Sequence, residues 1–408
     1  MKSRVLLICP EPLSEAKPAG VGIRFIEFAR QILKDGHSVT VLSADGGSVD
    51  GCASGTFDPA SLRQCSANSD VAIVQGHVIN DFIAHGSEIP LVVDLYDPWI
   101  VENFHYRDSH GFEVFEHDHA TLLASVRQGD FFLCASPAQR LFYLGFLLAA
   151  GRLNPDIFAA DPSLQSLIDV VPFGVPEPSR QGEQRAIDHN LLFGAIYDWY
   201  DPGLAMNAVR IARQSIPDLA LSFTRQPNPD LPQSASVEAM RRAAEENLEF
   251  VSFNPWVAYS DRSTYYDRFS LALLTFPSSL ETDLAMRTRI FDFLWAGLPV
   301  ICSSAPGTDA MIEQYGCGRI VRSNDPEEFA ATIVDVFHHP DEIHRMREGA
   351  RAWASDHQWS KTVEPLLRFC RAPRVDPYKA QPRAGDDSIT PIRRSVLKKF
   401  YDKLGGRL

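Results

Sequence analysis

The sequence predicts an α/β protein with two halves, each built on a parallel sheet covered by helices. The chain has 408 residues, which exceeds what one ordinary hydrophobic core accommodates and favours two domains. Short apolar runs rich in β-branched residues alternate with amphipathic stretches, an order typical of parallel βαβ units. This alternation stops at a polar stretch and then starts again. We therefore expect a first domain over residues 1–176, a linker over 177–190 and a second domain over 191–372.

In the first half, the clearest element is an amphipathic helix over residues 20–34. Its apolar residues recur at helical spacing, namely Ile23, Ile26, Phe28, Ile32 and Leu33. The turn-forming residues 35–37 end this helix. Strands are expected at residues 5–9, 38–42, 71–74, 91–95 and 131–134.

The second half repeats this pattern after the linker. Strands are expected at residues 191–193, 219–224, 249–253, 271–276 and 299–302, and helices at 202–214, 261–269, 289–296 and 326–338. Residues 373–408 differ from both halves. Four prolines and few apolar residues over 373–391 indicate a tether, and residues 393–408 carry six cations against one acid.

Composition and charge exclude several classes of protein. The net charge of −13 argues against general nucleic-acid binding, which needs a basic surface. Seven scattered cysteines without a CxxC pair indicate reduced thiols rather than disulfides or a zinc site. The N-terminus lacks a signal-peptide core, and the apolar run 141–151 falls short of the roughly 20 residues that span a membrane. We expect a cytoplasmic protein, and the only membrane surface at which we expect it is the inner face of the cytoplasmic membrane.

The C-terminal segment 392–404 predicts one kind of surface partner. Val396, Leu397, Phe400 and Leu404 share one helical stripe, and most of the cations lie around it. Such a helix suits an anionic membrane surface. A helix packed on its own domain or on a second subunit in a homodimer is the alternative.

Two stretches of the first half can carry a ligand. Gly20 and Gly22 lie where a strand passes into a helix, so backbone N–H groups can approach an anion there, and Arg24 can add a charge. The spacing is not GxGxxG, which disfavours a dehydrogenase. Asp97 follows a strand, at the sheet edge where open α/β sheets bind ligands. A helix cap is the alternative for Asp97.

Four histidines in the first half could in principle bind a metal. His105, His110, His117 and His119 lie among acidic residues, but their spacing fits neither HExxH nor a zinc finger. We expect no metal there, and a solvated helix or a loop that contacts an acceptor instead.

In the second half, residues 280–300 bring opposite charges together. Glu281 and Asp292 can each accept hydrogen bonds from a vicinal diol, as in a ribose. Arg287 and Arg289 offer guanidinium groups, which bind phosphates in a bidentate manner. A solvated, salt-bridged helix is the alternative.

The run DFLWAGLPV at residues 292–300 resembles the nucleotide-sugar motif of retaining glycosyltransferase family 4, whose domain is called glycosyltransferase group 1. The runs GVGIR, DLYDP and DWYDP are similar to those of bacterial surface-polysaccharide enzymes, such as those making lipopolysaccharide or capsule. The resemblance spans roughly residues 4–340. It implies a GT-B fold, in which two Rossmann-like domains face a central cleft. It also implies a nucleotide diphosphate sugar as donor, a glycan or lipid-linked acceptor, retention of configuration, and no cofactor or metal.

The resemblance also implies roles for single residues. Asp97 matches the Asp of a usual His-Asp pair, with Tyr96 in place of the His. Members of the family usually carry two glutamates eight residues apart. In this sequence Leu284 occupies the first of these positions and Asp292 the second. Glu281, three residues before Leu284, is therefore the candidate that replaces the first glutamate. The usual diphosphate-binding Arg and Lys of the second domain are replaced by Ala195 and an aromatic cluster.

The remaining assignments follow from these departures. The expected catalytic residues are Asp97, Arg287 and Arg289; the expected nucleotide-sugar contacts are Gly20, Gly22, Arg24, Trp199, Arg225, Asn254, Trp256, Glu281 and Asp292. Two other functions stay open. One is a GT-B sugar-nucleotide epimerase, and the other is a non-catalytic protein that binds a nucleotide sugar.

Overall fold

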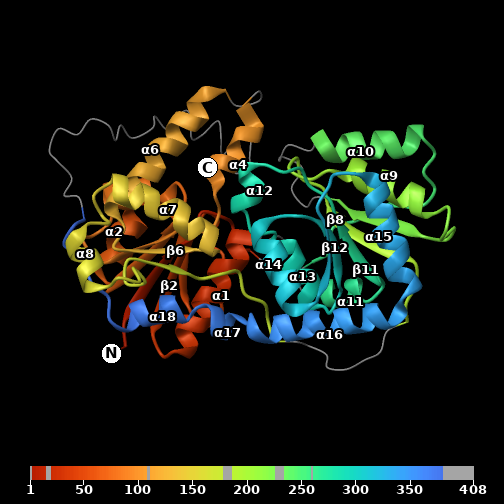
Figure 1. The fold of residues 1–408 in the computed structure, drawn as a ribbon. Coiled ribbons are helices and arrows are strands. Elements are labelled where there is room, and N and C mark those ends of the chain that lie inside the picture. Colours follow the sequence, from red (N-terminus) through yellow and green to blue (C-terminus); the bar gives the residue numbers. More distant parts are fainter. Residues whose placement is uncertain are drawn as a thin grey trace. The chain divides into compact units, whose positions relative to one another are not determined.

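The computed structural model describes residues 2–14, 20–107, 111–177, 186–225, 234–258 and 261–379 (Figure 1). The contacts divide these residues into two compact units. Unit 1 holds residues 2–174 and 359–379, and unit 2 holds residues 175–358. Each unit has its own parallel sheet, as the sequence predicts.

Unit 1 contains a seven-stranded sheet of order β3-β2-β1-β4-β5-β6-β7. Every pairing is parallel; Val5 of β1, for example, pairs with Val39 of β2 on one side and Val71 of β4 on the other. The central strands are buried, which explains their continuous apolar runs. The strands are β1 Arg4–Ile8, β2 Ser38–Ser43, β3 Ala53–Thr56, β4 Val71–Gln75, β5 Leu91–Asp94, β6 Phe131–Cys134 and β7 Ile168–Val170.

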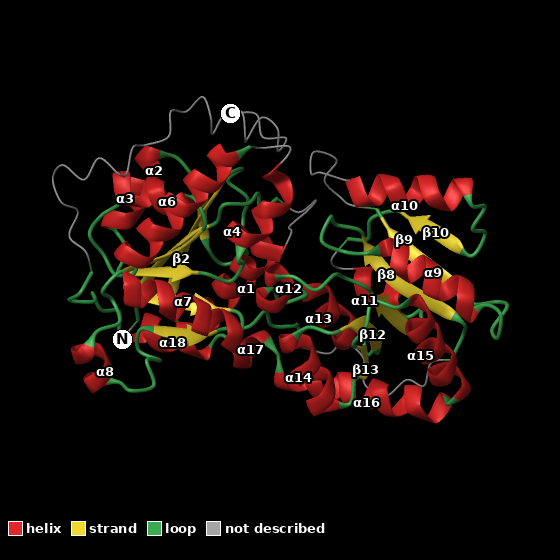
Figure 2. Cartoon of the chain, turned by 45° about the horizontal axis from the view of Figure 1, so that its top comes forward, coloured by secondary structure: helices red, strands yellow, loops and turns green. Residues whose placement is uncertain are grey.

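Helices enclose the strands of unit 1 (Figure 2). Several begin at a capping side chain followed by proline, as at Asp58, Ser136 and Asn154, an arrangement that satisfies the first free N–H groups. The helices are α1 Gly20–Lys34, α2 Pro59–Ala67, α3 Val78–His85, α4 Trp99–Glu102, the 3-10 helix η1 Asn103–Tyr106, α6 Phe112–Gln128, α7 Pro137–Ala149, α8 Pro155–Ala160, α17 Trp359–Thr362 and α18 Glu364–Arg371.

Unit 2 contains a six-stranded parallel sheet of order β10-β9-β8-β11-β12-β13. The register of β8 against β9 shifts between Leu192 and Gly194, and Gly194 has a φ of 86°. The strands are β8 Asn190–Ala195, β9 Ala220–Thr224, β10 Val251–Asn254, β11 Leu271–Leu274, β12 Val300–Ser303 and β13 Gly318–Val321. The sequence predicts all of these strands except β13.

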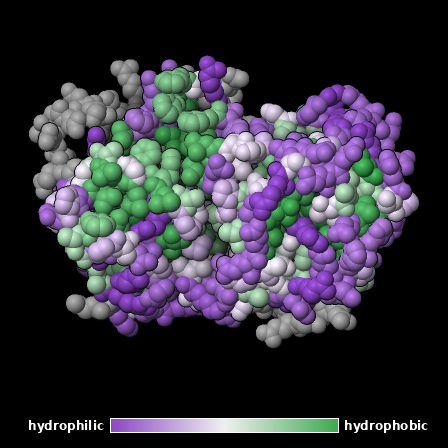
Figure 3. Space-filling view, viewed as in Figure 1, coloured by the Kyte–Doolittle hydropathy of each residue, from purple (hydrophilic) through white to green (hydrophobic). Residues whose placement is uncertain are grey.

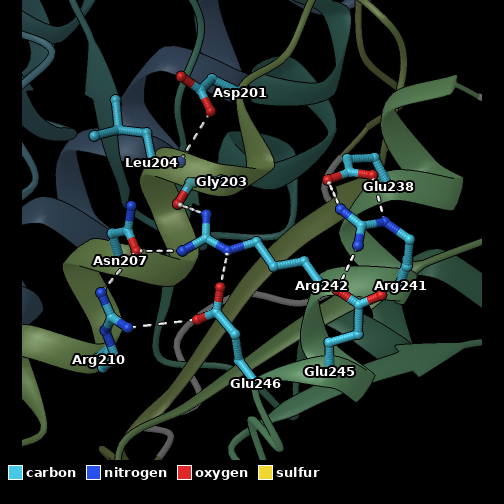
Figure 4. Close-up of polar contacts among 10 residues, drawn as sticks. All are labelled: Asp201, Gly203, Leu204, Asn207, Arg210, Glu238, Arg241, Arg242, Glu245 and Glu246. Carbon is cyan, nitrogen blue, oxygen red and sulfur yellow. Dashed lines mark hydrogen bonds and ion pairs between the residues drawn. The ribbon is translucent and has the colours of Figure 1, made fainter.

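The helices of unit 2 are α9 Pro202–Ala212, α10 Ser234–Glu245, α11 Arg262–Tyr266, α12 Leu280–Leu284, α13 Thr288–Trp295, α14 Pro306–Tyr315, α15 Pro326–His338 and α16 Pro340–Asp356. A polar network holds α10 on α9 (Figure 4). Arg242 of α10 donates to Glu246 and to Asn207 of α9, both at 2.6 Å. The polar groups of this network form hydrogen bonds with one another, so we assign them to the packing of α10 on α9 and not to ligand binding.

The last helices correct the predicted boundary of the second domain. The predicted range 191–372 includes α17 and α18, yet both belong to unit 1. The ring of Trp359 lies 6.2 Å from that of Phe28 and 4.8 Å from that of Phe173. Phe369 stacks on Phe131 at 4.9 Å. These aromatic contacts complete the core of unit 1, and hydrophobic periodicity alone does not show which sheet a terminal helix covers.

No helix within the described ranges is both long enough and apolar enough to cross a membrane.

Candidate functional site

The main candidate site of unit 2 lies at the carboxyl ends of its strands. In open parallel sheets, ligands bind there, next to the point where the strand order reverses. In unit 2 that point lies between β8 and β11. The loop after β8 and the start of α13, which follows β11, supply the side chains described next.

Arg289, the second residue of α13, is the central cation of this edge. Its guanidinium carbon lies 4.5 Å from the ring centre of Tyr200 and 5.5 Å from that of Tyr197. One guanidinium nitrogen donates to the backbone carbonyl of Phe193 at 3.3 Å. Across the described part of the chain, Arg289 forms no ion pair, so its charge is available for an anionic ligand.

Gly194 makes room for Arg289. A Cβ atom on Gly194 would lie 2.9 Å from Cδ of Arg289, and the φ of 86° is also one that other residues rarely adopt. A glycine at this position therefore lets the side chain of Arg289 pass close to the backbone of β8.

Asp292, one turn after Arg289, lies in a second charged group. Its carboxylate accepts a hydrogen bond from Arg262 at 2.5 Å, and the guanidinium of Arg262 lies 5.0 Å from the ring centre of Trp256. Burial raises the pKa of Asp292, although Arg262 and Arg289 oppose this effect. Asp292 and Trp256 are both predicted site residues, and both contact Arg262 in the structure. The sequence does not predict Arg262 as a site residue.

The loop after β8 forms an aromatic shelf. The rings of Tyr197 and Trp199 stack at 5.0 Å with an angle of 5° between their planes. Tyr200 packs edge to face against Phe193, with 5.7 Å between the ring centres and 76° between their planes. Both tyrosines contact Arg289, so Trp199, a predicted contact residue, is connected to this cation through the ring of Tyr197.

Glu281 and Arg287 form a buried ion pair with each other, and not the ligand contacts that the sequence predicts. The two guanidinium NH2 groups of Arg287 each donate to one carboxylate oxygen of Glu281 at 2.7 Å, and both side chains are 3% exposed. Thr282 accepts a further bond at 3.1 Å. This buried bidentate pair argues against the expected contacts of Glu281 with a ribose and of Arg287 with a phosphate, because either would require breaking the pair.

Arg225 and Asn254 lie at the ends of neighbouring strands. Arg225 follows β9 and is exposed, and its backbone N–H donates to the carbonyl of Asn254 at 2.9 Å. The side chain of Asn254 donates to the carbonyl of Phe223 at 3.3 Å and therefore ties β10 to β9. Arg225 is thus a second accessible cation near this sheet edge.

In unit 1, Arg24 is a structural residue. It is fully buried, and its guanidinium donates to both oxygens of the buried Asp94 at 2.7 and 3.0 Å. It also donates to the carbonyls of Val171 and Pro172. The structure therefore corrects the expectation that Arg24 adds a charge for an anionic ligand; instead it joins α1, β5 and the segment after β7.

Asp97 and Glu11 form an acidic edge in unit 1. Burial, together with the nearby acids, raises the pKa of Asp97 well above its usual range. Burial also raises the pKa of Glu11 to about 7, although Glu11 accepts a hydrogen bond from Gly22 N–H at 2.7 Å. In this structure, the Gly22 N–H, which the sequence offers to an anion, donates to Glu11 instead. Gly20 begins α1, and residues 15–19 before it lie outside the described ranges.

A histidine that no sequence motif marks, His77, belongs to a cluster on the same unit. His77 follows β4, and its ring lies 3.1 Å from the buried Asp118 and stacks on His117 at 4.4 Å. Burial lowers the pKa of His117 to about 4, so this ring is neutral. His105 and His119 are exposed and do not join this cluster, and His110 lies outside the described residues.

The described residues contain one group with metal-ligand geometry, and it lies elsewhere. Asp335, His339 and Glu342 are within reach of one ion on the surface of unit 2. Arg319 forms ion pairs with both acids of this group, so a protein cation already balances their charge.

Comparison with known proteins bears on both the fold and the site. Residues 203–339 match the family model described as Glycosyl transferases group 1. The match lies within unit 2 and covers about a third of the chain. This range contains Asp292, Arg289 and Arg262, while Tyr197 and Trp199 lie just before it. Among curated proteins, none matches the chain at a significant level.

Several solved structures share the fold along nearly the whole chain. HepE from Anabaena, in complex with UDP and glucose, has a TM-score of 0.63 and 16% identity, over 90% of this chain and 99% of its own. A glycosyltransferase from Rickettsia africae has a TM-score of 0.62 and 14% identity, over 91% and 98%. Sucrose-phosphate synthase from Thermosynechococcus elongatus has a TM-score of 0.60 and 13% identity, over 91% and 98%. The predicted GT-B fold is confirmed.

Proposed function

We propose that this chain is a retaining glycosyltransferase that moves a sugar from a nucleotide diphosphate sugar to a glycan or lipid-linked acceptor. The observation that carries the proposal is Arg289, a cation without an ion pair in the described structure, held by two aromatic rings at the ligand-binding edge of a glycosyltransferase group 1 domain. The related fold of HepE, solved with UDP and with UDP-glucose, supports a nucleotide-sugar donor.

Unit 2 supplies the donor contacts in this proposal. Arg289 binds the diphosphate and stabilises the charge that develops on it when the bond to the sugar breaks. Arg225 is the second candidate for the diphosphate. Asp292, oriented by Arg262, accepts hydrogen bonds from the ribose hydroxyls. Trp199 and Trp256 offer rings against which the base or the sugar stacks.

Unit 1 supplies the acceptor contacts. The acceptor oxygen forms a bond to the anomeric carbon as the bond from that carbon to the phosphate breaks, and the acceptor proton passes to the departing phosphate. Asp97 holds its proton to a higher pH than an ordinary aspartate, so it can donate a hydrogen bond to an acceptor oxygen. No protein base and no metal are required by this scheme.

The place of the reaction is part of the proposal. A cytoplasmic enzyme that builds surface polysaccharide needs access to growing glycans on lipid carriers. The basic segment 393–408 would bring it to anionic headgroups.

The test is incubation of the protein with a panel of sugar nucleotides, with and without glycan acceptors, followed by detection of released nucleoside diphosphate. We expect release that depends on the acceptor. Release or isomerisation without acceptor would indicate the epimerase instead.

A non-catalytic binding protein is the second candidate, and the buried Glu281–Arg287 pair favours it, because two charged groups that the resemblance assigns to the donor are unavailable. Tight nucleotide binding without any turnover would establish it.

A further inference from the structure

In unit 1, strand β4 ends at a glutamine whose side chain lacks one partner. Gln75 is 3% exposed, and its Oε1 atom forms no hydrogen bond within the described chain. Its Nε2 atom donates a long hydrogen bond, of 3.5 Å, to the carboxyl group of Asp97, which follows β5. A buried oxygen without a hydrogen bond destabilises a fold, and a ligand that donates to this oxygen would remove the destabilisation.

The surroundings of Gln75 leave room for a ligand. Gly76, the next residue, is half-buried, and a Cβ atom built on it would meet no atom of the described chain within 4 Å. Asp97 is also half-buried. Strands β4 and β5 pair in parallel, with Gln75 opposite Asp94, so their carboxyl ends form one edge. Open α/β sheets bind ligands at such an edge.

Two half-buried aromatic rings follow the ends of the same strands. His77, two residues after β4, lies with Nε2 3.1 Å from Asp118 and Nδ1 3.3 Å from the hydroxyl of Thr121. The ring of Trp99, at the start of α4, lies 5.1 Å from that of His77. Both nitrogens of His77 have partners, so this ring is held in place, and with Trp99 it offers an aromatic surface rather than a free base.

The aromatic surface continues beyond Trp99. Helix α4, which carries Trp99, packs against η1 and α6. Phe104 of η1 is 50% exposed and Phe112 of α6 is 64% exposed, and both rings contact that of Phe115, at 5.9 and 5.1 Å between ring centres. Figure 3 shows hydrophobic side chains exposed over this part of unit 1. Aromatic side chains beside a few polar groups are typical of small-molecule sites, and such rings suit the apolar faces of a sugar.

The charges around Asp97 disfavour an anionic ligand. After burial, Glu102, Asp94 and Glu11 are the groups that raise the pKa of Asp97, and Arg24 lowers it. Arg24 donates to both oxygens of Asp94, so its charge is already balanced. An incoming phosphate would be repelled by the remaining acids, whereas neutral hydroxyl groups can hydrogen-bond to both Gln75 and a protonated Asp97.

We propose that Gln75 is a specificity-determining residue for a neutral acceptor sugar, one of whose hydroxyl groups donates a hydrogen bond to Oε1 of Gln75. The oxygen of an adjacent hydroxyl accepts a hydrogen bond from Asp97, and the rings at this edge contact the sugar. The inference rests on the proposed function, which places the acceptor on unit 1, and it names the chemical class of the acceptor group bound there. Gln75 forms no bond to the reacting atoms; it selects and positions the sugar.

The test is the binding of methyl α-glucoside, methyl α-galactoside and methyl α-mannoside to the full-length protein in the presence of UDP, measured by saturation-transfer difference NMR. We expect at least one of these neutral sugars to bind. Glycerol phosphate, as an anionic probe, should bind more weakly. The monodeoxy derivatives of the bound sugar identify the hydroxyl that donates to Gln75, because the derivative that lacks it should lose affinity.

Gln75→Leu removes the oxygen and keeps a side chain of similar size. It should raise the dissociation constant of the bound sugar by about 3- to 10-fold, as expected for the loss of one neutral hydrogen bond. The monodeoxy derivative that lacks the recognised hydroxyl should bind the wild type and the variant equally. Gln139→Leu is the matched control. Gln139 is also a buried glutamine of unit 1, but its Oε1 accepts a hydrogen bond from the Ala135 N–H at 2.7 Å. Gln139→Leu should bind the sugar as the wild type does.

The melting temperatures of the same variants separate ligand recognition from a structural role. Gln75→Leu removes a buried oxygen without a partner, so it should melt at or above the temperature of the wild type. Gln139→Leu should melt at a lower temperature, because it leaves the Ala135 N–H without its acceptor. A fall with Gln75→Leu as large as that with Gln139→Leu would overturn the proposal, since it would assign the oxygen to the fold.

Three binding results would also overturn the proposal. The first is a wild type that binds none of the methyl glycosides. The second is equal binding of every monodeoxy derivative and its parent, a test that needs no variant. The third is tighter binding of glycerol phosphate than of every methyl glycoside, which would indicate a phosphate-bearing acceptor. Sugar binding that depends on Gln75, without any release of UDP from UDP-glucose that depends on the sugar, would leave the sugar site in place and contradict the transferase activity alone.

Discussion

Replacing Arg289 with alanine should weaken the binding of nucleoside diphosphates while leaving the fold intact. Arg289 makes one long hydrogen bond to a backbone carbonyl and two ring contacts, and no ion pair within the described residues. Ring contacts of this kind contribute about 0.5–1 kcal/mol each. We therefore expect the free energy of unfolding to fall by only about 1–2 kcal/mol.

The loss of binding should be larger than the loss of stability. One charge-assisted hydrogen bond is worth about 1.5–3 kcal/mol, and each 1.4 kcal/mol changes an affinity tenfold. Arg289→Ala should thus raise the dissociation constant for a nucleoside diphosphate by a factor of about 10 to 150. The effect on a nucleoside without phosphates should be small, because Arg289 is assigned to the phosphates.

Isothermal titration calorimetry with UDP, GDP and ADP, and with the matching nucleosides, measures this difference. Arg319→Ala is a suitable control, since Arg319 lies on β13 of the same unit and pairs with surface acids. The reasoning is refuted if a nucleotide that binds the wild type binds the folded Arg289→Ala variant equally well.

Three further predictions concern the charged groups. Arg287→Met should lower the free energy of unfolding by about 3–5 kcal/mol in urea titrations, because it leaves Glu281 buried without a partner. The double variant Arg287→Met/Glu281→Leu should regain most of this free energy. A double variant as unstable as Arg287→Met would contradict the assignment of the loss to the unpaired Glu281. The pKa of Glu11 is raised to about 7, so the folded state binds more protons than the unfolded state, and the free energy of unfolding should fall as pH rises from about 4.5 to 7. Glu11→Gln should flatten this pH dependence in urea titrations at several pH values. An unchanged pH dependence in the variant would assign it to other groups. The pKa of Asp292 is also raised, so the affinity for a nucleoside should weaken as the pH falls through that pKa. Asp292→Asn should remove this pH dependence in calorimetry. A wild-type affinity that does not vary with pH would contradict the ribose contact of Asp292.

Local pattern predicts much of this fold. The predicted helices 20–34 and 326–338 and the predicted strand 131–134 have the bounds found in the structure. Their apolar residues have a clear period or form a short buried run between turn residues. The strands β3 and β13 were missed because their exposed and half-exposed residues give no continuous apolar signal.

The site was harder to predict because side-chain partners are distant in sequence. The sequence predicts Asp292 and Arg289 as ligand contacts, but tertiary contacts determine which residues lie next to them. Arg262 lies 30 residues before Asp292 and belongs to no motif that marks it. The sequence predicts Glu281 and Arg287 as ligand contacts, and only the fold shows that the two side chains pair with each other and are buried.

The most direct test of the central claim is a crystal structure of the protein soaked with UDP or UDP-glucose. We expect the diphosphate at the carboxyl ends of β8 and β11, with its oxygens within hydrogen-bond distance of the Arg289 guanidinium and the ribose near Asp292. A nucleotide bound elsewhere, with Arg289 still packed only on Tyr197 and Tyr200, would contradict the account.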